Sequence, residues 1–249
     1  LLIVVSAFLL EIIDASLGMG YGTLLTPALI MLGFDTLHIV PAVLVSQLAG
    51  DFLAAFFHHQ FKNVDFSVGS RHFKIAMTLG SLSVVGTIIA VVIAINLSKL
   101  YLNLYIGILV AVTGLIVLTT RNRDYGFSWI RLLILGFLAA FNKGISGGGY
   151  GPMVTAGQIV TGVEARSAIG VTCLAAVVKF NIAVLMYLLI GGDFHWRLVI
   201  LLSIGVSFSA PVAAFIVRKI EAGRLKLVIG VFPLLLVLST ILKTLVSFL

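Results

Sequence analysis

Five ionisable side chains stand inside long apolar runs of this sequence, namely Glu11, Asp14, Asp51, Lys143 and Lys179. Charged groups are costly inside a membrane, so residues of this kind mark substrate or ion pathways by default. A lysine at such a place supplies a fixed positive charge for an anion. A carboxyl group there is a candidate proton carrier, because burial favours its neutral form. We therefore expect Lys143 and Lys179 to bind an anion, and Glu11, Asp14 and Asp51 to take part in coupling.

Each of these residues also has a structural alternative. Asp14 and Lys143 occupy equivalent positions of an internal repeat, so a buried ion pair between them is equally compatible with the sequence. Lys179 corresponds to Gly50, the neighbour of Asp51, which leaves a Lys179 to Asp51 pair open beside the favoured anion role. Glu11 is as readily explained by a side chain that reaches toward a membrane interface.

The repeat is visible in two glycine-rich stretches that lie 129 residues apart. Residues 17–35 read LGMGYGTLLTPALIMLGFD, and residues 146–164 read SGGGYGPMVTAGQIVTGVE. Shared hydrophobicity does not explain identities at glycine and tyrosine, so the pattern indicates a duplication. The identical pairs are Gly18 with Gly147, Gly20 with Gly149, Tyr21 with Tyr150, Gly22 with Gly151, Thr26 with Thr155, Ile30 with Ile159, and Gly33 with Gly162.

The glycines interrupt an apolar run in each repeat. A glycine costs an exposed helix about 1 kcal/mol relative to alanine, and freed backbone groups inside a bilayer need protein or water partners. We expect a broken helix at each site, with short helices that begin at Thr23 and at Pro152, rather than a small-residue packing face. The N-termini of such half-helices attract anions. The expected ligand residues are Gly20, Tyr21, Gly22, Thr23, Lys143, Ser146, Gly149, Tyr150, Gly151 and Lys179.

Polar residues beside the two breaks add to this list of candidates. They are expected either to hydrogen-bond a ligand or, as is more common, to bond a neighbouring helix. These residues are Ser46, Gln47, Asn142, Thr172 and Asn181.

The elements that must position these residues are membrane spans. The chain is 61% hydrophobic and 10% charged, whereas a soluble domain carries about 25% charged residues. Apolar runs long enough to span a bilayer are expected at 1–33, 37–57, 73–95, 98–119, 127–162, 166–190, 197–217 and 225–248. The opening run contains Glu11 and Asp14 and has an internal counterpart, which favours a membrane segment over a cleaved signal peptide. We expect a first repeat at 1–120, a central loop at 121–126 and a second repeat at 127–249.

The distribution of Lys and Arg discriminates between two topologies. If each broken segment crosses the bilayer once, the basic residues divide almost evenly between the two sides. If each broken segment enters and returns, eleven basic residues share one side and only Lys99, Arg197 and Lys243 lie opposite. Because cytoplasmic loops carry the excess of Lys and Arg, we expect inverted repeats with re-entrant helices and both termini outside.

Several other classes of protein are disfavoured by what the sequence lacks. It contains no G-x-x-x-x-G-K-[ST] motif, no G-x-S-x-G elbow and no H-E-x-x-H motif, so we expect no enzyme activity. One cysteine, Cys173, excludes an internal disulfide. We expect no metal site and no cofactor, since His58, His59, His72 and His195 have no ligand spacing and are expected to be solvated loop or interface residues. The net charge of +7 is better explained by membrane orientation than by nucleic-acid binding.

The doubled glycine pattern in Gly18–Gly33 and Gly147–Gly162 resembles the TauE/SafE sulfite exporter family, also called the toluene sulfonate uptake permease family. The resemblance covers essentially the whole chain, including the charged central loop at 121–124. The sequence departs from the family pattern at Met19, where a third glycine is frequent, and at Ala156, which has no proline to match Pro27.

The resemblance implies movement of sulfite or organosulfur anions, such as sulfoacetate and sulfonates, across a bacterial inner membrane. The expected function is thus a multi-pass secondary transporter that works as an exporter, with a small sulfur-containing anion and membrane lipid as its partners. Small residues on several helices permit a homodimer. Two alternatives stay open at this point, namely an anion channel and a non-transporting membrane assembly protein.

Overall fold

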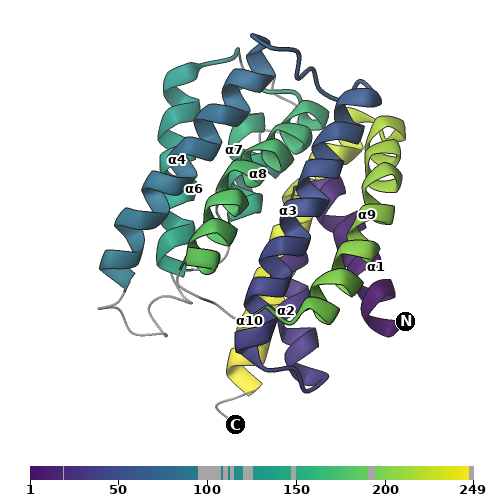
Figure 1. Cartoon of the computed structure of the whole chain (residues 1–249). Helices are drawn as coiled ribbons and strands as arrows, with labels where there is room; N and C mark the ends of the chain where they lie inside the picture. The colour runs from purple at the N-terminus through teal and green to yellow at the C-terminus, as the bar shows by residue number, and fades with distance from the viewer. Residues whose placement is uncertain are drawn as a thin grey trace. The chain divides into compact units, whose positions relative to one another are not determined.

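The computed structural model describes residues 1–18, 20–94, 108, 112, 115–119, 126–146, 150–189 and 194–246. The regular structure of these residues is entirely helical, as expected (Figure 1). The expected span at 98–119 lies mostly outside the described residues. The described helices are α1 (Leu2–Leu17), α2 (Tyr21–Met31), α3 (Thr36–Gln60), α4 (Arg71–Ala94), α6 (Trp129–Ser146), α7 (Tyr150–Val160), α8 (Ala165–Leu189), α9 (Trp196–Lys219) and α10 (Ala222–Val246).

Helix lengths recur along the chain with the period of the sequence repeat. Helices α2 and α7 both have 11 residues, and α3 and α8 both have 25. Each pair begins at positions 129 residues apart. Gly33 and Gly162, which follow α2 and α7, have φ of 86° and 92°, a left-handed conformation that glycine adopts without strain. The sequence repeat is therefore also a repeat of local structure.

The glycines of the first repeat end one helix and begin another. Gly18 has φ 75° and ψ 24°, and its backbone N–H donates to Asp14 O, which is the usual left-handed cap of a helix C-terminus. Gly20 has φ 126°, a value that side chains other than glycine rarely adopt. The expected break is present, but α2 and α7 begin at Tyr21 and Tyr150, two residues before the expected Thr23 and Pro152. Helix α2 begins early because the backbone N–H of Tyr21 has a hydrogen-bond acceptor, which is described below.

The described chain forms two compact units, each of which draws on both sequence halves. The first unit contains residues 1–81 and 169–219. Within it α1 and α3 pack along α9 (Figure 1). A Cβ atom on Gly205 of α9 would lie 2.6 Å from Val4 O and 2.8 Å from Ala7 Cβ, so the backbones of α1 and α9 touch there. Such close approach through small residues is typical of helix packing in membranes.

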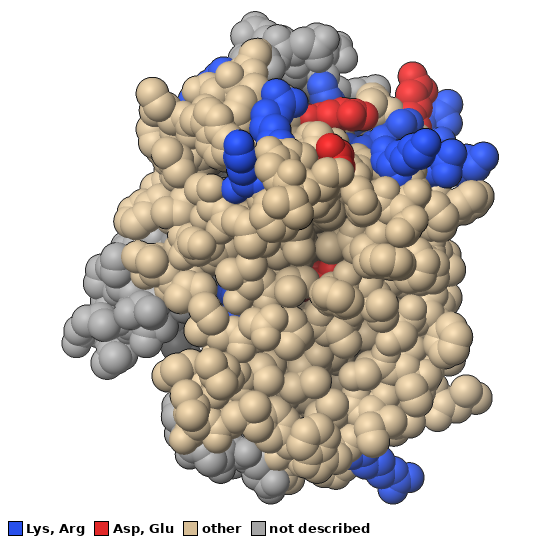
Figure 2. All heavy atoms as spheres, turned by 45° about the horizontal axis from the view of Figure 1, so that its top comes forward, with Lys and Arg blue, Asp and Glu red and all other residues tan. Residues whose placement is uncertain are grey.

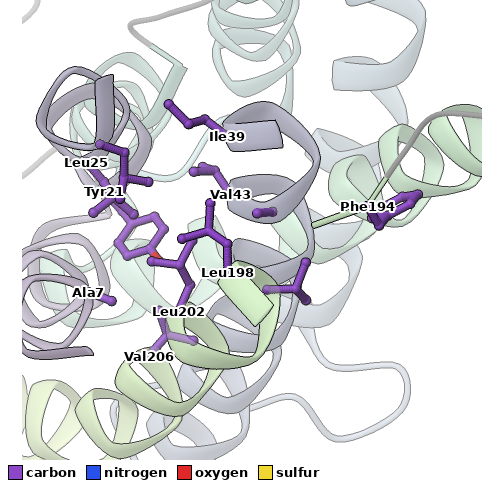
Figure 3. Packing of buried hydrophobic residues seen from close by; sticks show 12 residues of the cluster. Ala7, Tyr21, Leu25, Ile39, Val43, Phe194, Leu198, Leu202 and Val206 are labelled. Atoms are coloured by element: carbon purple, nitrogen blue, oxygen red, sulfur yellow. The ribbon is translucent and has the colours of Figure 1, made fainter. Parts of the chain in front are cut away.

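The core of the first unit surrounds Tyr21. Its ring is fully buried among Leu25, Val43 and Leu202, as Figure 3 shows. The cluster thereby joins α2 to α3 and α9, and it fixes the first turn of α2, which follows the glycine break. The complete cluster consists of Ala7, Tyr21, Leu25, Leu29, Ile39, Ala42, Val43, Phe194, Leu198, Val199, Leu202 and Val206.

The second unit, which contains residues 82–168 and 220–249, is organised around α6 and α7. Ser128 N donates to Thr161 O at 3.2 Å, so the residue before α6 lies beside the residue after α7. Farther along, a Cβ on Gly157 would lie 3.3 Å from Leu135 Cβ. Residue numbers rise along α6 as they fall along α7, so the two helices form an antiparallel hairpin.

Apolar side chains cover the outside of the helices as well as the inside. On α9 the exposed residues Ile200, Ile204 and Phe208 follow one another at intervals of four, on the face opposite buried Leu202 and Val206. Water would penalise such a stripe, whereas lipid accepts it. Among the described residues, three helices are long and apolar enough to cross a bilayer, namely His38–Gln60, Ala165–Leu189 and Trp196–Lys219. The chain is thus a multi-pass membrane protein, and Figure 2 shows its charged side chains gathered mainly at one end of the face in view.

The expectation that His58 is a solvated loop residue is wrong. Helix α3 continues to Gln60, and the His58 side chain has no exposed surface. His58 Nε2 lies 2.9 Å from Ala15 O of α1, and Asn63 Nδ2 lies 3.0 Å from His58 Nδ1 and 2.8 Å from Ala214 O of α9. The neutral imidazole with its hydrogen on Nε2 satisfies both contacts. His58 and Asn63 therefore tie the ends of three helices together.

Candidate functional site

The first break is bridged by a carboxylate. Tyr21 N, the first backbone amide of α2, donates a 2.9 Å hydrogen bond to Asp14 Oδ1 in the last turn of α1. The first N–H groups of a helix have no partner within it, and a negative charge there is favourable to the helix dipole. Asp14 therefore acts as the N-terminal cap of the helix that follows the break. The anion at this helix N-terminus is thus a side chain of the protein itself.

The side chain of Tyr21 continues this connection into α3. Its hydroxyl lies 3.1 Å from Ser46 Oγ, and Ser46 Oγ donates to Val43 O at 3.0 Å. Because the single hydroxyl hydrogen of Ser46 is used in that bond, Tyr21 O–H is the donor to Ser46. Both side chains are fully buried. The start of α2 is consequently held at its backbone by α1 and at its side chain by α3.

Glu11 lies one turn before Asp14 and is 1% exposed, yet both of its carboxyl oxygens lack a hydrogen-bond partner in the part of the chain that the structure describes. Its Oε1 lies 2.6 Å from the place that a Cβ on Gly50 would occupy, and Val206 Cβ lies 3.2 Å from that place. The carboxyl group therefore fills the space left by the missing side chain of Gly50, where α1, α3 and α9 meet. An orphaned polar group in this position is unusual and calls for an explanation.

A second carboxyl group, Asp51, is 3% exposed on α3. It has a hydrogen bond with the thiol of Cys173, and the charge of Lys179 acts on it from α8. Lys179 is partly buried, and its Nζ lies 4.1 Å from the centre of the Phe180 ring, a cation–π distance. The structure thus brings together Glu11, Asp14, Asp51 and Lys179 in one unit, with the two other carboxylates acting on Glu11.

Several expected site residues are only partly described. Gly151 lies in the first turn of α7, and Gly22 lies in the first turn of α2. Lys143 and Ser146 lie in the last turns of α6, and Tyr150 begins α7, but their side chains are outside the described part. The side chain of Thr23 and all of Gly149 are likewise outside it. The alternative ion pair between Asp14 and Lys143 therefore stays a prediction.

Three contacts at this site were missed by sequence reasoning. Gly50 leaves room for the carboxyl group of Glu11, and the thiol of Cys173 forms a hydrogen bond with Asp51. The third contact is that of Gln47 Oε1, which lies 3.3 Å from the Cβ position of Gly22. Spacing along the sequence could not have indicated the first of these, because Gly50 and Glu11 lie on different helices. Among the other polar candidates, Ser46 and Thr172 are buried, whereas Asn181 is exposed on α8.

The described residues contain no group of three or more His, Cys, Asp or Glu side chains arranged to hold a metal ion. The cluster in the first unit consists of the carboxyl groups of Glu11, Asp14 and Asp51, the thiol of Cys173 and the amino group of Lys179. Such an arrangement can bind and release protons and can compensate one negative charge with one positive charge.

Comparison with known proteins identifies the class of this chain. Residues 3–240 match the family described as Sulfite exporter TauE/SafE. The chain is 26% identical over 248 residues to the Probable membrane transporter protein YtnM of Bacillus subtilis (strain 168), a match that covers 94% of this chain and 79% of that protein. No solved structure gives a significant match.

Family membership agrees with the helical, lipid-compatible fold and with the resemblance of the two glycine-rich stretches. A transporter family of this kind is not a family of enzymes. With its apolar helices and its nearly full-length match, the chain belongs to the TauE/SafE sulfite exporter family of membrane transporters.

Proposed function

We propose that this protein is a secondary transporter that exports sulfite or small organosulfur anions, such as sulfoacetate and sulfonates, across the inner membrane by alternating access. The observation that carries the proposal is the bond from Tyr21 N to Asp14 Oδ1. A half-helix next to a glycine break accepts a carboxylate at its N-terminus, which is the interaction that a transported anion requires.

The two breaks are not equivalent in charge. At the first, the N-terminus of α2 already holds the carboxylate of Asp14. At the second, the position equivalent to Asp14 is Lys143, so the sequence offers α7 a cation instead of a carboxylate. The substrate anion accordingly binds at the start of α7, with Lys143, Ser146, Gly149, Tyr150 and Gly151 around it. Gly20, Tyr21, Gly22 and Thr23 form the equivalent turn in the first repeat.

Lys179, in the first unit, is the other lysine that we propose to bind an anion. It extends from the middle of α8, and it is balanced in part by Asp51. When the anion binds, Lys179 exchanges this carboxylate for the substrate, whereas Asp51, Asp14 and Glu11 form the coupling side of the site. A lysine shared between a carboxylate and a substrate links anion binding to the charge state of the cluster.

The re-entrant arrangement is supported by helix length and by the α6–α7 hairpin. Helices α2 and α7 have 11 residues each and rise about 16 Å, roughly half of the apolar thickness of a bilayer. The start of α6 and the end of α7 lie side by side, so this hairpin enters and leaves at the same end of its unit. A half-helix that ends near the midplane presents its N-terminus there, which is where an anion is bound in transporters with broken helices.

Charge at the ends of the first unit supports the orientation. The bond from Asn63 Nδ2 to Ala214 O places the loop after α3 beside the end of α9, so Lys62, Arg218 and Lys219 share one end. Arg197 lies at the other end of α9, about 33 Å from Lys219 along the helix. This distribution fits a cytoplasmic side with Lys62 and Arg218 and an outer side with Arg197.

The proposal is tested by sulfite and sulfoacetate flux into proteoliposomes over a range of anion concentrations, with and without a pH gradient. Saturable flux supports a transporter. Flux that rises in proportion to concentration favours the alternative of an anion channel, which would use the same half-helix N-termini. No flux of either anion contradicts the proposed substrates.

Lys179→Ala tests the position of the positive charge. The variant is expected to weaken sulfite binding about tenfold or more, since one charge-assisted hydrogen bond is worth roughly 1.5–3 kcal/mol. Arg224→Ala is the matched control, because Arg224 is an exposed cation that pairs with exposed Glu221 at 3.8 Å. Normal binding by Lys179→Ala would contradict the assigned role.

We also propose that the protein forms a homodimer, and chemical crosslinking in the same vesicles tests this.

A further inference from the structure

Glu11 is the least compensated ionisable group in the described chain. It is 1% exposed, and neither Oε1 nor Oε2 has a hydrogen-bond partner. An ionised carboxylate in such a place would lose its hydration without gaining a partner, a cost of several kcal/mol. A protonated carboxyl group has no charge and only one donor to satisfy. The surroundings of Glu11 are therefore those of a carboxyl group that binds a proton.

The helices around Glu11 provide negative rather than positive neighbours. Asp14, three residues farther on α1, shares its face of the helix and acts on Glu11, as does Asp51 of α3. From α9, Val206 packs at the same place, with its Cβ 3.2 Å from the Cβ position of Gly50. The charged residues of α9, namely Arg197, Arg218 and Lys219, stand in the end turns of that helix. The remaining titratable groups of the cluster are Tyr21 on α2 and Cys173 and Lys179 on α8.

The three carboxyl groups differ in how each is compensated. Asp14 accepts the N–H of Tyr21 at the N-terminus of α2, where the helix dipole favours a negative charge. Asp51 has the charge of Lys179 and a hydrogen bond with Cys173. Glu11 has neither a positive charge nor a hydrogen-bond donor among the described contacts. Of the three carboxyl groups, Glu11 is thus the one that must be neutral while it is buried.

We infer that Glu11 is the binding site of a transported proton, and that this site couples the pH gradient to the first glycine break. The inference rests on the proposed transport function for its second half. A proton bound at Glu11 removes the repulsion between Glu11 and Asp14 and leaves Asp14 free to cap α2. Release of the proton, when the site opens to water, places a negative charge one helical turn from Asp14. The repulsion weakens the bond to Tyr21 N, and the half-helix α2 is freed to move.

The cluster selects a proton over a metal cation. A cation such as Na⁺ or Ca²⁺ requires several oxygen ligands directed at one point, and the described residues offer no grouping of three or more His, Cys, Asp or Glu side chains for a metal. A proton needs a single carboxyl oxygen. Gly50 leaves room for this carboxyl group, because a Cβ there would lie 2.6 Å from Glu11 Oε1.

Infrared difference spectroscopy of the purified protein in lipid tests proton binding directly and does not require a substrate. At neutral pH the wild type is expected to show the carbonyl stretch of a protonated carboxylic acid. Glu11→Gln removes this band. The matched control Asp65→Asn leaves it unchanged, because Asp65 is an exposed carboxylate outside the helices. Absence of the band in the wild type, or its persistence in Glu11→Gln, overturns the assignment.

Gly50→Ala provides a second variant in case Glu11→Gln fails to fold. Its methyl group presses on the Glu11 carboxyl, so the frequency of the same band shifts. A band that keeps its frequency in Gly50→Ala contradicts the placement of the protonated group at Glu11.

Sulfite flux in proteoliposomes tests the coupling. In the wild type an imposed pH gradient accelerates sulfite flux and an imposed Na⁺ gradient does not. In Glu11→Gln the flux becomes equal with and without the pH gradient. Flux of Glu11→Gln that still follows the pH gradient, or wild-type flux that follows Na⁺ instead, contradicts the inference. If the wild type shows the infrared band but carries no sulfite, the proposed substrate fails while the proton site stands.

Discussion

The carboxylate of Asp14, in the last turn of α1, accepts a 2.9 Å hydrogen bond from the backbone N–H of Tyr21, the first residue of α2. Two helices separated by glycines are thus joined by a side chain of one and the main chain of the other. Tyr21 adds a second attachment through Ser46 on α3. The break is therefore a defined junction, held at the backbone by α1 and at the side chain by α3.

Replacement of Asp14 tests this junction. Asp14→Ala is expected to lower the free energy of unfolding by about 1–2 kcal/mol, because it removes a helix cap and leaves the Tyr21 N–H without its acceptor. Asp14→Asn keeps an oxygen acceptor and should cost less. Equilibrium unfolding in mixed micelles measures both. Equal losses for the two variants would mean that the hydrogen bond does not stabilise the break.

Gly205 tests the contact between α1 and α9. Gly205→Ala places a methyl group 2.6 Å from Val4 O, which is backbone and cannot rotate away. Overpacking of this kind costs typically 1–3 kcal/mol, and the same unfolding assay will detect it. Gly126→Ala is the control, because nothing lies within 4 Å of the added atom. A Gly205→Ala protein as stable as Gly126→Ala would show that the helices separate easily.

The buried pair His58 and Asn63 is expected to act as one unit. His58→Ala leaves Ala15 O without its donor, and Asn63→Ala leaves Ala214 O without its donor. Each single variant should lose about 1–3 kcal/mol of unfolding free energy. The double variant should lose less than the sum, since the two side chains also bond one another at 3.0 Å. Additive losses in this double-mutant cycle would contradict a shared network.

Asp65 provides a prediction about pH outside the membrane spans. Hydrogen bonds from the Ser67 hydroxyl and the Ser67 backbone N–H lower the pKa of the Asp65 carboxyl. A group with a lowered pKa in the folded state stabilises the protein above its unfolded pKa, and that contribution is lost as the pH falls through the folded pKa. Carboxyl NMR titration should give a pKa below the ordinary aspartate value. Ser67→Ala should raise it, and an unchanged value would contradict the role of the hydroxyl.

Much of the fold could be predicted from the sequence because lipid imposes a simple rule on composition. Long apolar runs gave the positions of α3, α4, α8, α9 and α10 to within a few residues. The glycine repeats predicted both breaks. The helix starts at Tyr21 and Tyr150 were missed by two residues, since the N–H of Tyr21 finds its acceptor in a side chain of the preceding helix.

The site was predictable only in part. The sequence singled out Glu11, Asp14 and Asp51 one by one, as acidic residues within apolar runs, but it did not show that the three act on one another in a single cluster. Their different partners depend on tertiary packing, which periodicity does not reveal. The burial of His58 was missed for the same reason, because its partners, Ala15 and Asn63, are a distant carbonyl and a loop side chain.

The most direct test of the central claim is sulfite counterflow in proteoliposomes. Vesicles that contain the wild-type protein are preloaded with unlabelled sulfite, and uptake of labelled sulfite is compared with that of empty vesicles. Alternating access predicts faster uptake into the preloaded vesicles, because a loaded carrier returns more readily than an empty one. Equal uptake into both would indicate a channel, and no protein-dependent uptake into either would contradict sulfite transport.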